Sequence, residues 1–486
     1  MQAQEENQHL PLDYVDASQV NFLPPHAYAS QSSTSQPSAS TSYLPSVGDV
    51  DEDEDELQSD QDESDDEHQH RSLKRKRAVE DDDEDGQPSK KWHGLAGPPP
   101  PPPEQPSRPH RDRRNVQRTK SRRARKVGAI DASTSTAHRA RLAKKASTVE
   151  ADFDSGHILN FTSGYLGRER VKKEVKAQRR VYELEELVGP DSIWKFQKLW
   201  WDHKLTNGRR GPTLIADTND LAFTARIPPP AGDPTFPQAA EDAAAILDEY
   251  RPRFFNINKP LKWHRRGHFP VKAMGVSFGG GQEEAKELYQ TDRDQELINQ
   301  IRDMPCFQRL AGHASAAFLT WAPRLYSFYA EYMDQLRNMI PNLVFNFWNS
   351  IFACVTLNFG PTTTTVEHVD HMNYVYGWCA ITALGNFDYK RGGHLVLWDL
   401  KLVVEVPPGW TMLIPSAFLR HSNTSLQAGE TRFSLTQYTA AGLFRILSDN
   451  GVARTKMTPT QLAHAQQEQI NRITKALNRF STLDQL

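Results

Sequence analysis

The chain has 486 residues, and its 58 Lys and Arg nearly balance 61 Asp and Glu, so length and charge permit two or three domains with a sizeable core. Its three cysteines are far apart and form no Cys-x-x-Cys pair, which argues against a disulfide framework or a zinc finger and fits a reducing compartment. The first residues do not look like a signal peptide and no run of 18 apolar residues occurs. We therefore expect a soluble, intracellular protein without a membrane partner.

Residues 1–150 are predicted to be disordered, because they contain few large apolar residues, a six-proline run and strongly segregated charge. Residues 51–67, for example, carry twelve acids and no base. Two basic clusters, KRKR at 74–77 and KK at 90–91, have the spacing of a bipartite nuclear localisation signal and predict a nuclear protein. The alternative is a solvated basic run with no targeting role.

A second basic segment, residues 108–145, carries fourteen Lys or Arg and only two Asp, with no aromatic residue among them. It lacks the rings on which single-stranded bases stack, but it can neutralise phosphates without reading sequence. It can equally serve as a counterweight to the acidic run. The charged tail as a whole is a candidate contact for chromatin proteins.

Helices are predicted on both sides of the chain's centre. Apolar residues recur at helical spacing over 168–206 and again over 309–339, where aromatic residues form a stripe that suits a core better than a cofactor site. A C-terminal helix begins with Thr458 as N-cap, Pro459 at N1 and Gln461 at N3, which together form a capping box. Its apolar seam is predicted to dock on the core or on another chain and consists of Ile470, Ile473, Leu477 and Phe480.

Strands dominate the sequence after residue 343. Seven or eight short apolar runs are separated by turn residues, a pattern typical of a β-barrel or sandwich. The runs are VFNFW, FACVTLNFG, VYGWCAITAL, HLVLWDL, LVVEV, TMLIP and FSLTQY. The expected organisation is a disordered tail (1–150), a helical N-terminal part (151–250), a β-rich domain (251–446) and a C-terminal helix (447–486).

Within the β-rich domain, His368-Val369-Asp370 is a candidate metal-binding triplet. Residues two apart on an extended chain point to the same side, so His368 and Asp370 can hold one ion while His371 points elsewhere. The triplet alone is weak evidence, because His110-Arg111-Asp112 in the basic tail has the same form. His421 supplies a second histidine after several predicted strands. Two histidines and one carboxylate fit a facial triad, which leaves positions open for a co-substrate and O2.

Arg432 is a candidate anion-binding residue for the same site. If 427–430 form a hairpin turn, Arg432 pairs near Ser425, about 13 Å along the strand from His421. A five-carbon diacid plus an extended arginine spans that gap, and Ser434 on the same face can add a hydrogen bond. The alternative is that His421 caps a turn and Arg432 makes a surface ion pair. Strand order and roles favour the metal site.

The chain resembles the iron(II)- and 2-oxoglutarate-dependent dioxygenases, and within them the TET/JBP branch, especially its fungal members. The resemblance is good over 345–446 and fades towards 250. It is carried by HVDHMN at 368–373, RGGHLVLWDL at 391–400, PPGWTMLIPSAFLRHSN at 407–423 and RFS at 432–434. It implies an α+β fold whose core is a double-stranded β-helix of the jelly-roll or cupin kind, flanked by helices.

The resemblance also implies roles for individual residues. His368, Asp370 and His421 would hold Fe(II), and Arg432 with Ser434 would bind the 5-carboxylate of 2-oxoglutarate. Asn358 is a candidate for its 1-carboxylate. Asn373 matches the position that contacts a flipped base in TET-like members, although Asn is also a common turn cap. Where those members tend to carry a base-contacting histidine stands Ala440, so Gln437 or Tyr438 is a candidate substitute.

Three functions follow from these expectations. The first is oxidation of a methylated base, most simply 5-methylcytosine flipped out of DNA. The second is hydroxylation of a protein side chain by the same chemistry, and the third is a non-catalytic chromatin-binding protein with a vestigial barrel. Residues 251–280 contain several bases, five aromatic residues and no acid, which suits a surface that tracks phosphates and stacks on bases, or else a flexible loop.

Overall fold

The computed structural model describes residues 142–158, 164–167, 179–199, 211–279, 282, 284–340, 343–452 and 456–486. The acidic run, the predicted nuclear localisation signal, nearly all of the basic segment and the ends of 168–206 lie outside these ranges, as do the side chains of Gln469 and Ile470. The described residues all belong to one compact unit.

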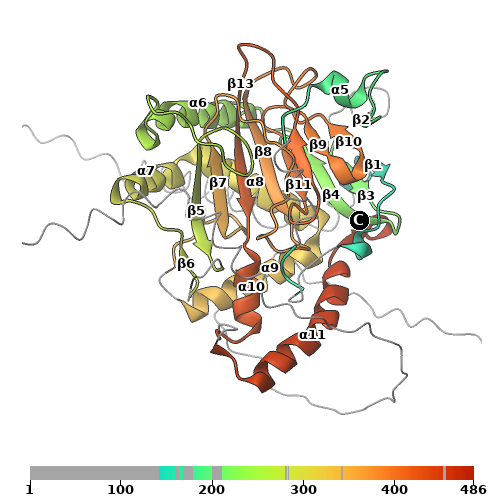
Figure 1. Cartoon of the computed structure of the whole chain (residues 1–486), viewed down its shortest axis with the longest axis vertical. Helices are drawn as coiled ribbons and strands as arrows, with labels where there is room; N and C mark the ends of the chain where they lie inside the picture. The colour runs from blue at the N-terminus through green and yellow to red at the C-terminus, as the bar shows by residue number, and fades with distance from the viewer. Residues whose placement is uncertain are drawn as a thin grey trace, which may run out of the picture. The chain divides into compact units, whose positions relative to one another are not determined.

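The centre of the fold is a ten-stranded mixed sheet (Figure 1). Its order is β1(Ser147–Glu150), β3(Thr213–Ala216), β4(Leu221–Ile227), β11(Thr411–Ile414), β8(Cys379–Asn386), β13(Thr431–Tyr438), β7(Cys354–Asn358), β5(Val271–Ser277) and β6(Lys286–Glu287), with β14(Ser481–Thr482) on β4. A second sheet has four strands in the order β12(His421–Asn423), β9(Leu395–Leu397), β10(Leu402–Val404) and β2(Gln197–Leu199).

Seven α-helices accompany the sheets in the described part of the chain, which makes the fold α+β as predicted. They are α5(Leu184–Val188), α6(Phe236–Phe254), α7(Asp292–Asp303), α8(Pro305–Trp321), α9(Pro323–Met339), α10(Ala441–Ser448) and α11(Pro459–Leu477). The face of α6 that packs on the sheet is built from alanines such as Ala239 and Ala243, whose small side chains let the helix lie close to Leu384 and Leu435. This packing fixes one side of the large sheet.

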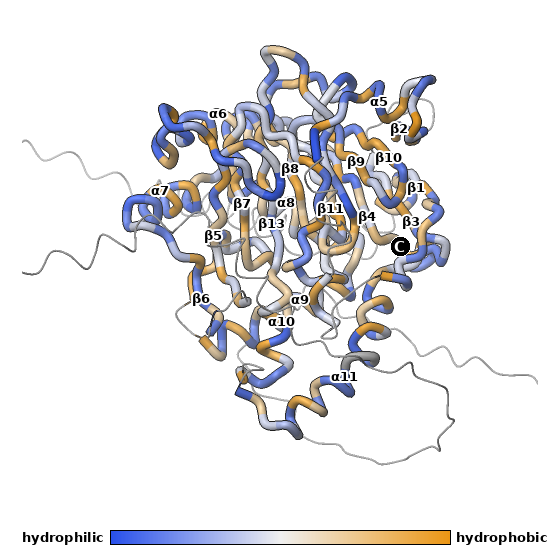
Figure 2. The backbone as a smooth tube through the Cα atoms, in the orientation of Figure 1, coloured by the Kyte–Doolittle hydropathy of each residue, from blue (hydrophilic) through white to orange (hydrophobic). Residues whose placement is uncertain are grey.

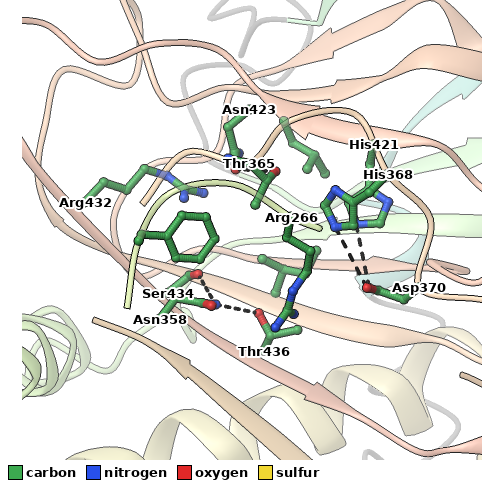
Figure 3. A pocket seen from close by; sticks show the side chains of 13 residues that line it. Arg266, Asn358, Thr365, His368, Asp370, His421, Asn423, Arg432, Ser434 and Thr436 are labelled. Atoms are coloured by element: carbon green, nitrogen blue, oxygen red, sulfur yellow. Dashed lines mark hydrogen bonds and ion pairs between the residues drawn. The ribbon is translucent and has the colours of Figure 1, made fainter. Parts of the chain in front are cut away.

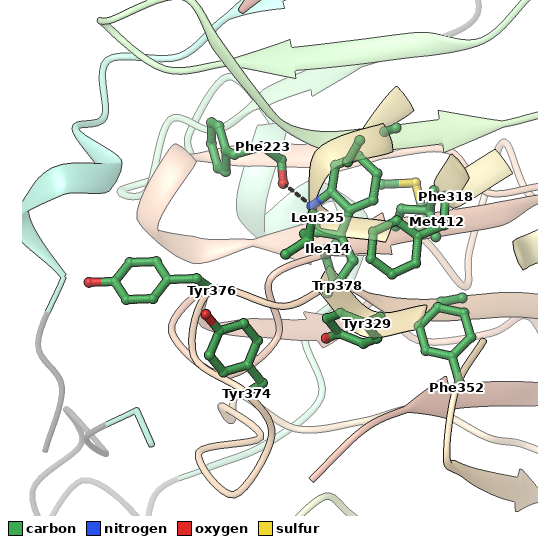
Figure 4. Close-up of a cluster of buried hydrophobic side chains, with 14 of the residues drawn as sticks. Phe223, Phe318, Leu325, Tyr329, Phe352, Tyr374, Tyr376, Trp378, Met412 and Ile414 are labelled. Atoms are coloured by element: carbon green, nitrogen blue, oxygen red, sulfur yellow. Dashed lines mark hydrogen bonds between the residues drawn. The ribbon is translucent and has the colours of Figure 1, made fainter. Parts of the chain in front are cut away.

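The aromatic stripe predicted over 309–339 lies in the core, but on two helices and not one. Pro323 has no backbone N–H and disfavours a helical conformation at the preceding residue, and Ala322 accordingly leaves the helix with φ −140° and ψ 64°. Figure 4 shows the resulting cluster around Trp378, whose Nε1 donates a 2.7 Å hydrogen bond to the Phe223 carbonyl. The aromatic residues are therefore structural.

The helical expectation for 151–250 is wrong for most of the described residues there. Only α5 and α6 are α-helices, and β3 and β4 join the central sheet next to β11. Within 168–206, charged residues between apolar ones imitate a helical period, but the described part, residues 179–199, forms the short helix α5 and then β2. The run VFNFW is also irregular and forms no strand.

The C-terminal helix agrees with its predicted cap. The Thr458 side chain accepts from the Gln461 backbone, and Gln461 reaches back to the N-cap. Figure 2 shows hydrophobic and hydrophilic segments alternating along α11. Phe480 is fully buried, and Ile473 and Leu477 pack on the core, so these three residues of the seam dock on their own chain. Among the described helices, none is both long and apolar enough to cross a bilayer.

Candidate metal centre

His368, Asp370 and His421 converge at one point between the two sheets. All three are buried, and one potential ligand atom from each lies within 4.8 Å of the others. The Asp370 carboxylate presents Oδ1 at 3.8 Å from Nε2 of His368 and Oδ2 at 3.8 Å from Nε2 of His421 (Figure 3). His371, as expected, takes no part in this group. Two nitrogens and a carboxylate thus face a common centre.

Backbone pairing creates this convergence. The amide of His368 donates to the His421 carbonyl and the amide of His421 donates back, which ties the loop after β7 to β12. The Asp370 amide donates to the Ser416 carbonyl at 2.8 Å, in the loop that leads to β12. The three side chains are therefore positioned by hydrogen bonds between segments about 50 residues apart.

Both imidazoles are held in the tautomer that suits a metal. Nδ1 of His368 lies 2.8 Å from the Val366 carbonyl, and Nδ1 of His421 lies 2.9 Å from the Leu419 carbonyl. A carbonyl only accepts hydrogen bonds, so each Nδ1 carries the proton and each Nε2 presents its lone pair to the centre. The rings cannot easily turn away.

Charge is also set for metal binding. Burial lowers the pKa of both histidines, so they are neutral at pH 7. Burial alone would raise the pKa of Asp370, but the positive charges of Arg265 and Arg266 beside it hold this pKa well below its usual value. Arg265 contributes directly, since its Nη2 donates to Asp370 Oδ1 at 3.0 Å. The group is two neutral imidazoles beside a carboxylate, which needs no proton loss before it binds a cation.

The centre opens into a pocket with about 410 Å³ of open space, including its mouth. One wall is β13, whose alternating residues Arg432, Ser434 and Thr436 line the pocket, while Phe433 and Leu435 face the core. The remaining lining residues are Arg266, Phe269, Asn358, Thr365, His368, Asp370, Ile381, Leu395, His421 and Asn423.

Arg432 is a buried cation without an acidic partner among the described residues. Its Nη1 donates to the Thr363 carbonyl at 2.7 Å, and its Nε has no partner. Burial lowers the pKa of Arg432 to about 10, which still leaves the guanidinium charged at pH 7. A buried charge of this kind is costly unless an anion compensates it. Nε and Nη2 remain as a fork for a carboxylate.

Asn358 shares the pocket wall with Ser434. Its Nδ2 donates to Ser434 Oγ at 2.9 Å, while its buried Oδ1 has no partner. Both predicted residues therefore line the pocket beside Arg432. The predicted hairpin is wrong, however: Arg432 pairs with Gly385 of β8, whereas β12 pairs with β9. The turn at 427–430 crosses from one sheet to the other, so His421 and Arg432 meet across the pocket.

The other candidates have different environments. Gln437 is fully buried on the core face of β13, where its Oε1 accepts from Ser350, because strand alternation turns it away from the pocket; its predicted base contact is wrong. Tyr438 follows Thr436 on the same face of β13 but is not among the residues that line the pocket. Asn373 lies outside the pocket lining, donates to Ser416 Oγ at 3.2 Å and forms a backbone bridge with Ala440.

Sequence reasoning missed Arg265 and Arg266. His264 and Gly267 exchange both backbone hydrogen bonds at 3.0 Å, which closes a two-residue turn with the two arginines at its tip. Arg265 binds Asp370, while Arg266 lines the pocket and has no hydrogen-bond or ion-pair partner from its guanidinium among the described residues. Figure 3 places Arg266 between the metal ligands and the row formed by Asn358, Ser434 and Thr436. The sequence signal for the two arginines is the acid-free stretch 251–280, which predicts an exposed surface.

No protein-family model matches the sequence, and no curated protein is similar to it at the sequence level. Among solved structures, one described as NgTET1 in complex with 5mC DNA is similar at 14% sequence identity and a TM-score of 0.34. The match covers 56% of this chain and 92% of that chain. Similarity of this degree carries no functional weight, and the function below rests on the pocket.

Proposed function

We propose that the chain is an iron(II)- and 2-oxoglutarate-dependent dioxygenase of the TET/JBP kind, acting on a methylated base in DNA, most simply 5-methylcytosine. In this proposal the two sheets form a double-stranded β-helix around the pocket. The observation that carries it is one cavity lined both by two neutral histidines with a carboxylate and by a buried arginine that lacks an anion.

The donor set fits Fe(II). Two imidazoles and one carboxylate on one side of an ion leave its other positions open, which is the ligand pattern of non-haem iron oxygenases. A structural zinc site normally closes its coordination with a fourth protein ligand, often Cys. Among the described residues, no fourth His, Cys, Asp or Glu joins this group. His368, Asp370 and His421 would hold the ion.

The pocket also fits a dicarboxylate co-substrate. The free Nε and Nη2 of Arg432 would grip the distal carboxylate, with Ser434 Oγ adding a hydrogen bond. Two groups are available for the carboxylate nearer the metal: the amide of Asn358, predicted from the sequence, and the unpaired guanidinium of Arg266. We favour Arg266, since a cation offsets a carboxylate better than a neutral amide does.

When bound, the iron and 2-oxoglutarate use O2 to insert one oxygen into a C–H bond of the substrate and the other into succinate, with release of CO2. The protein's share is orientation and electrostatics. Arg265 holds Asp370 in place, and the two Nδ1–H groups lock the histidine rings. Ile381, Leu395 and Phe269 supply the apolar part of the pocket lining.

The choice of a nucleic-acid base rests on the surroundings of the site. A methyl group stacked inside a duplex cannot reach a buried centre, so the base must be flipped out. The turn beside the metal ligands comes from a stretch with many bases and no acid. Asn373 and Tyr438, which lie on elements next to the metal ligands, are our candidates for contacts to the base. We also propose nuclear import through 74–77 and 90–91 and chromatin contacts through the charged tail.

The test is incubation of the full chain with Fe(II), 2-oxoglutarate, O2 and an oligonucleotide that contains 5-methylcytosine, followed by digestion and nucleoside mass spectrometry. We expect oxidised cytosine bases with wild type and none with Asp370→Ala. Asp112→Ala, which alters the matching His-x-Asp triplet of the basic tail, is the control and should behave as wild type. If 2-oxoglutarate is consumed on a histone-like peptide while no base is oxidised, the substrate is a protein.

A further inference from the structure

We propose that Trp263 and His268 form a base-stacking platform at the rim of the pocket, which holds the nucleic-acid strand beside the target base. The inference rests on the proposed function and deepens it. It names the residues that engage the polymer outside the site of chemistry.

The platform belongs to the same small hairpin that enters the metal centre. His264 and Gly267 close its turn, and Trp263 and His268 are the next pair outward. Their rings stack, with centroids 5.2 Å apart and planes inclined by 18°. The His268 ring is held from below, because its Nε2 lies 2.9 Å from the Leu261 carbonyl. The pair is thus built into the hairpin and is not a loose surface side chain.

The hairpin is fixed to the pocket at two points. Arg265 donates to Asp370 and to the Val369 carbonyl, and the Val366 amide donates to the Arg266 carbonyl at 2.9 Å. A ligand that stacks on Trp263 therefore sits two residues from a side chain that touches a metal ligand. When a base is flipped out of a duplex, it enters the active site while its neighbour on the strand remains outside. The platform and the metal centre are positioned for these two adjacent bases.

Exposure and charge select a nucleic acid as the occupant. Trp263 is 62% exposed although His268 covers part of it, and Ile257 is 67% exposed nearby in the chain. Lys259 and Lys262 precede Trp263 in the chain and are exposed, and residues 251–280 contain no acid. An aromatic face beside lysines binds the base and the phosphate of one nucleotide together. An apolar partner would leave the charges of these lysines uncompensated, and a basic partner would be repelled by them.

The chain offers a matched control. Trp348 is also 62% exposed. It precedes the first residue of β7, whereas the pocket residue Asn358 is the last residue of that strand. Its Nε1 donates to Gln308, and no ring stacks on it among the described aromatic pairs. Replacement of either tryptophan removes an equally exposed indole ring. A difference in nucleic-acid affinity between the two variants therefore reflects where the ring lies.

The first experiment measures affinity by fluorescence anisotropy with the full chain and a methylated oligonucleotide, without 2-oxoglutarate, so that no turnover occurs. We expect Trp263→Ala to weaken binding about tenfold, Trp263→Phe to retain most of the affinity and Trp348→Ala to match wild type. Lys262→Ala should lower the slope of log affinity against log salt by about 0.7–0.9. Equal affinities of Trp263→Ala and Trp348→Ala would overturn the platform.

A second measurement separates the platform from the basic tail, which binds phosphates in any variant. An oligonucleotide with 5-iodouracil next to the methylated cytosine is photocross-linked to the full chain, and the adducts are mapped by mass spectrometry. We expect adducts on the peptide that contains Trp263 and His268. Adducts only within 108–145, which has no Phe, Trp or Tyr, would refute the proposal. Neither measurement depends on catalysis, so the dioxygenase proposal stands or falls separately in the nucleoside assay.

Discussion

His368 and His421 exchange both of their backbone hydrogen bonds, at 3.0 and 2.9 Å, so a single paired step of two distant segments sets the spacing of the two imidazoles. Metal binding should therefore report on the folded core. We expect Mn(II) or Fe(II) to raise the melting temperature of the wild-type protein. At a metal concentration 100 times its dissociation constant, binding adds about 2.7 kcal/mol to the free energy of unfolding.

Differential scanning fluorimetry with and without metal checks this expectation. Asp370→Ala should abolish the shift, because it removes the ligand that faces both histidines, whereas Asp112→Ala should keep it. An equal shift in both variants would place the metal elsewhere.

The ion-pair network outside the histidines should tune metal affinity. Arg420 precedes His421 and donates to Glu367, which precedes His368, at 2.9 Å; it also binds Asp399. Glu367→Gln keeps the shape but removes the charge that ties the two histidine segments together. We expect metal affinity to fall by up to about tenfold, the low end of the effect of losing an outer contact to a metal site. Competition with a chelator measures it.

Glu186→Gln is the control for that experiment. It breaks the exposed ion pair of Glu186 with Arg180, which lies outside the metal centre, and should leave metal affinity unchanged. The same loss in both variants would mean that charge alone, and not this link, is responsible.

Arg432→Lys should impair use of 2-oxoglutarate more than it impairs folding. Lysine keeps the charge, but it cannot present the two parallel N–H groups that Nε and Nη2 offer. Loss of one charged hydrogen bond corresponds to about 2 kcal/mol, or roughly thirtyfold in the KM for 2-oxoglutarate. Succinate formation at varied co-substrate concentration measures it. Arg391→Lys, at an exposed arginine hydrogen-bonded to Gln427, should leave KM unaltered.

Stability should fall in acid because of a half-buried histidine, His313 of α8. Burial lowers the pKa of His313 to about 4; its Nε2 donates to the Pro228 carbonyl, and Arg309 and Asp233 lie nearby. The unfolded chain takes up this proton near pH 6.5, whereas the folded chain does so only near pH 4. Between these values the unfolded state binds more protons, so stability decreases as the pH falls, by at most about 3 kcal/mol from this group.

Urea unfolding at pH 7 and pH 5 checks the sign. His313→Gln retains a donor for Pro228 and cannot be protonated, so its stability should vary less with pH than that of wild type. His464→Gln, at an exposed position of α11, should follow the wild-type curve. A wild-type protein that gains stability towards pH 5 would contradict this account.

Much of the site could be predicted from the sequence because its signals are local. His368 and Asp370 lie two apart in an extended segment, and Arg432 and Ser434 alternate on one strand, so each pair shares a face by backbone geometry alone. The capping box of Thr458 and Gln461 is equally local, and α11 begins where it predicts. These features need no knowledge of which strand pairs with which.

The errors concern information that only the tertiary fold supplies. A short turn at 427–430 predicts a hairpin that puts Arg432 beside Ser425, but β13 pairs with β7 on one edge and with β8 on the other. The sequence predicts a base contact for Gln437, but strand alternation turns its side chain to the face opposite Thr436, into the core. Arg265 and Arg266 resembled surface charge, because nothing in the local sequence shows that their turn folds back onto the loop of Asp370.

The alternation along β13 has a consequence for how this protein can change. Every second residue contributes to the co-substrate wall, and the residues between them, Phe433 and Leu435, belong to the apolar interior. A shift of this strand by one residue would turn the guanidinium of Arg432 into the apolar core and the phenyl ring of Phe433 into the pocket. An inserted or deleted residue here would therefore abolish folding and chemistry in a single event, whereas point substitutions remain free to separate them.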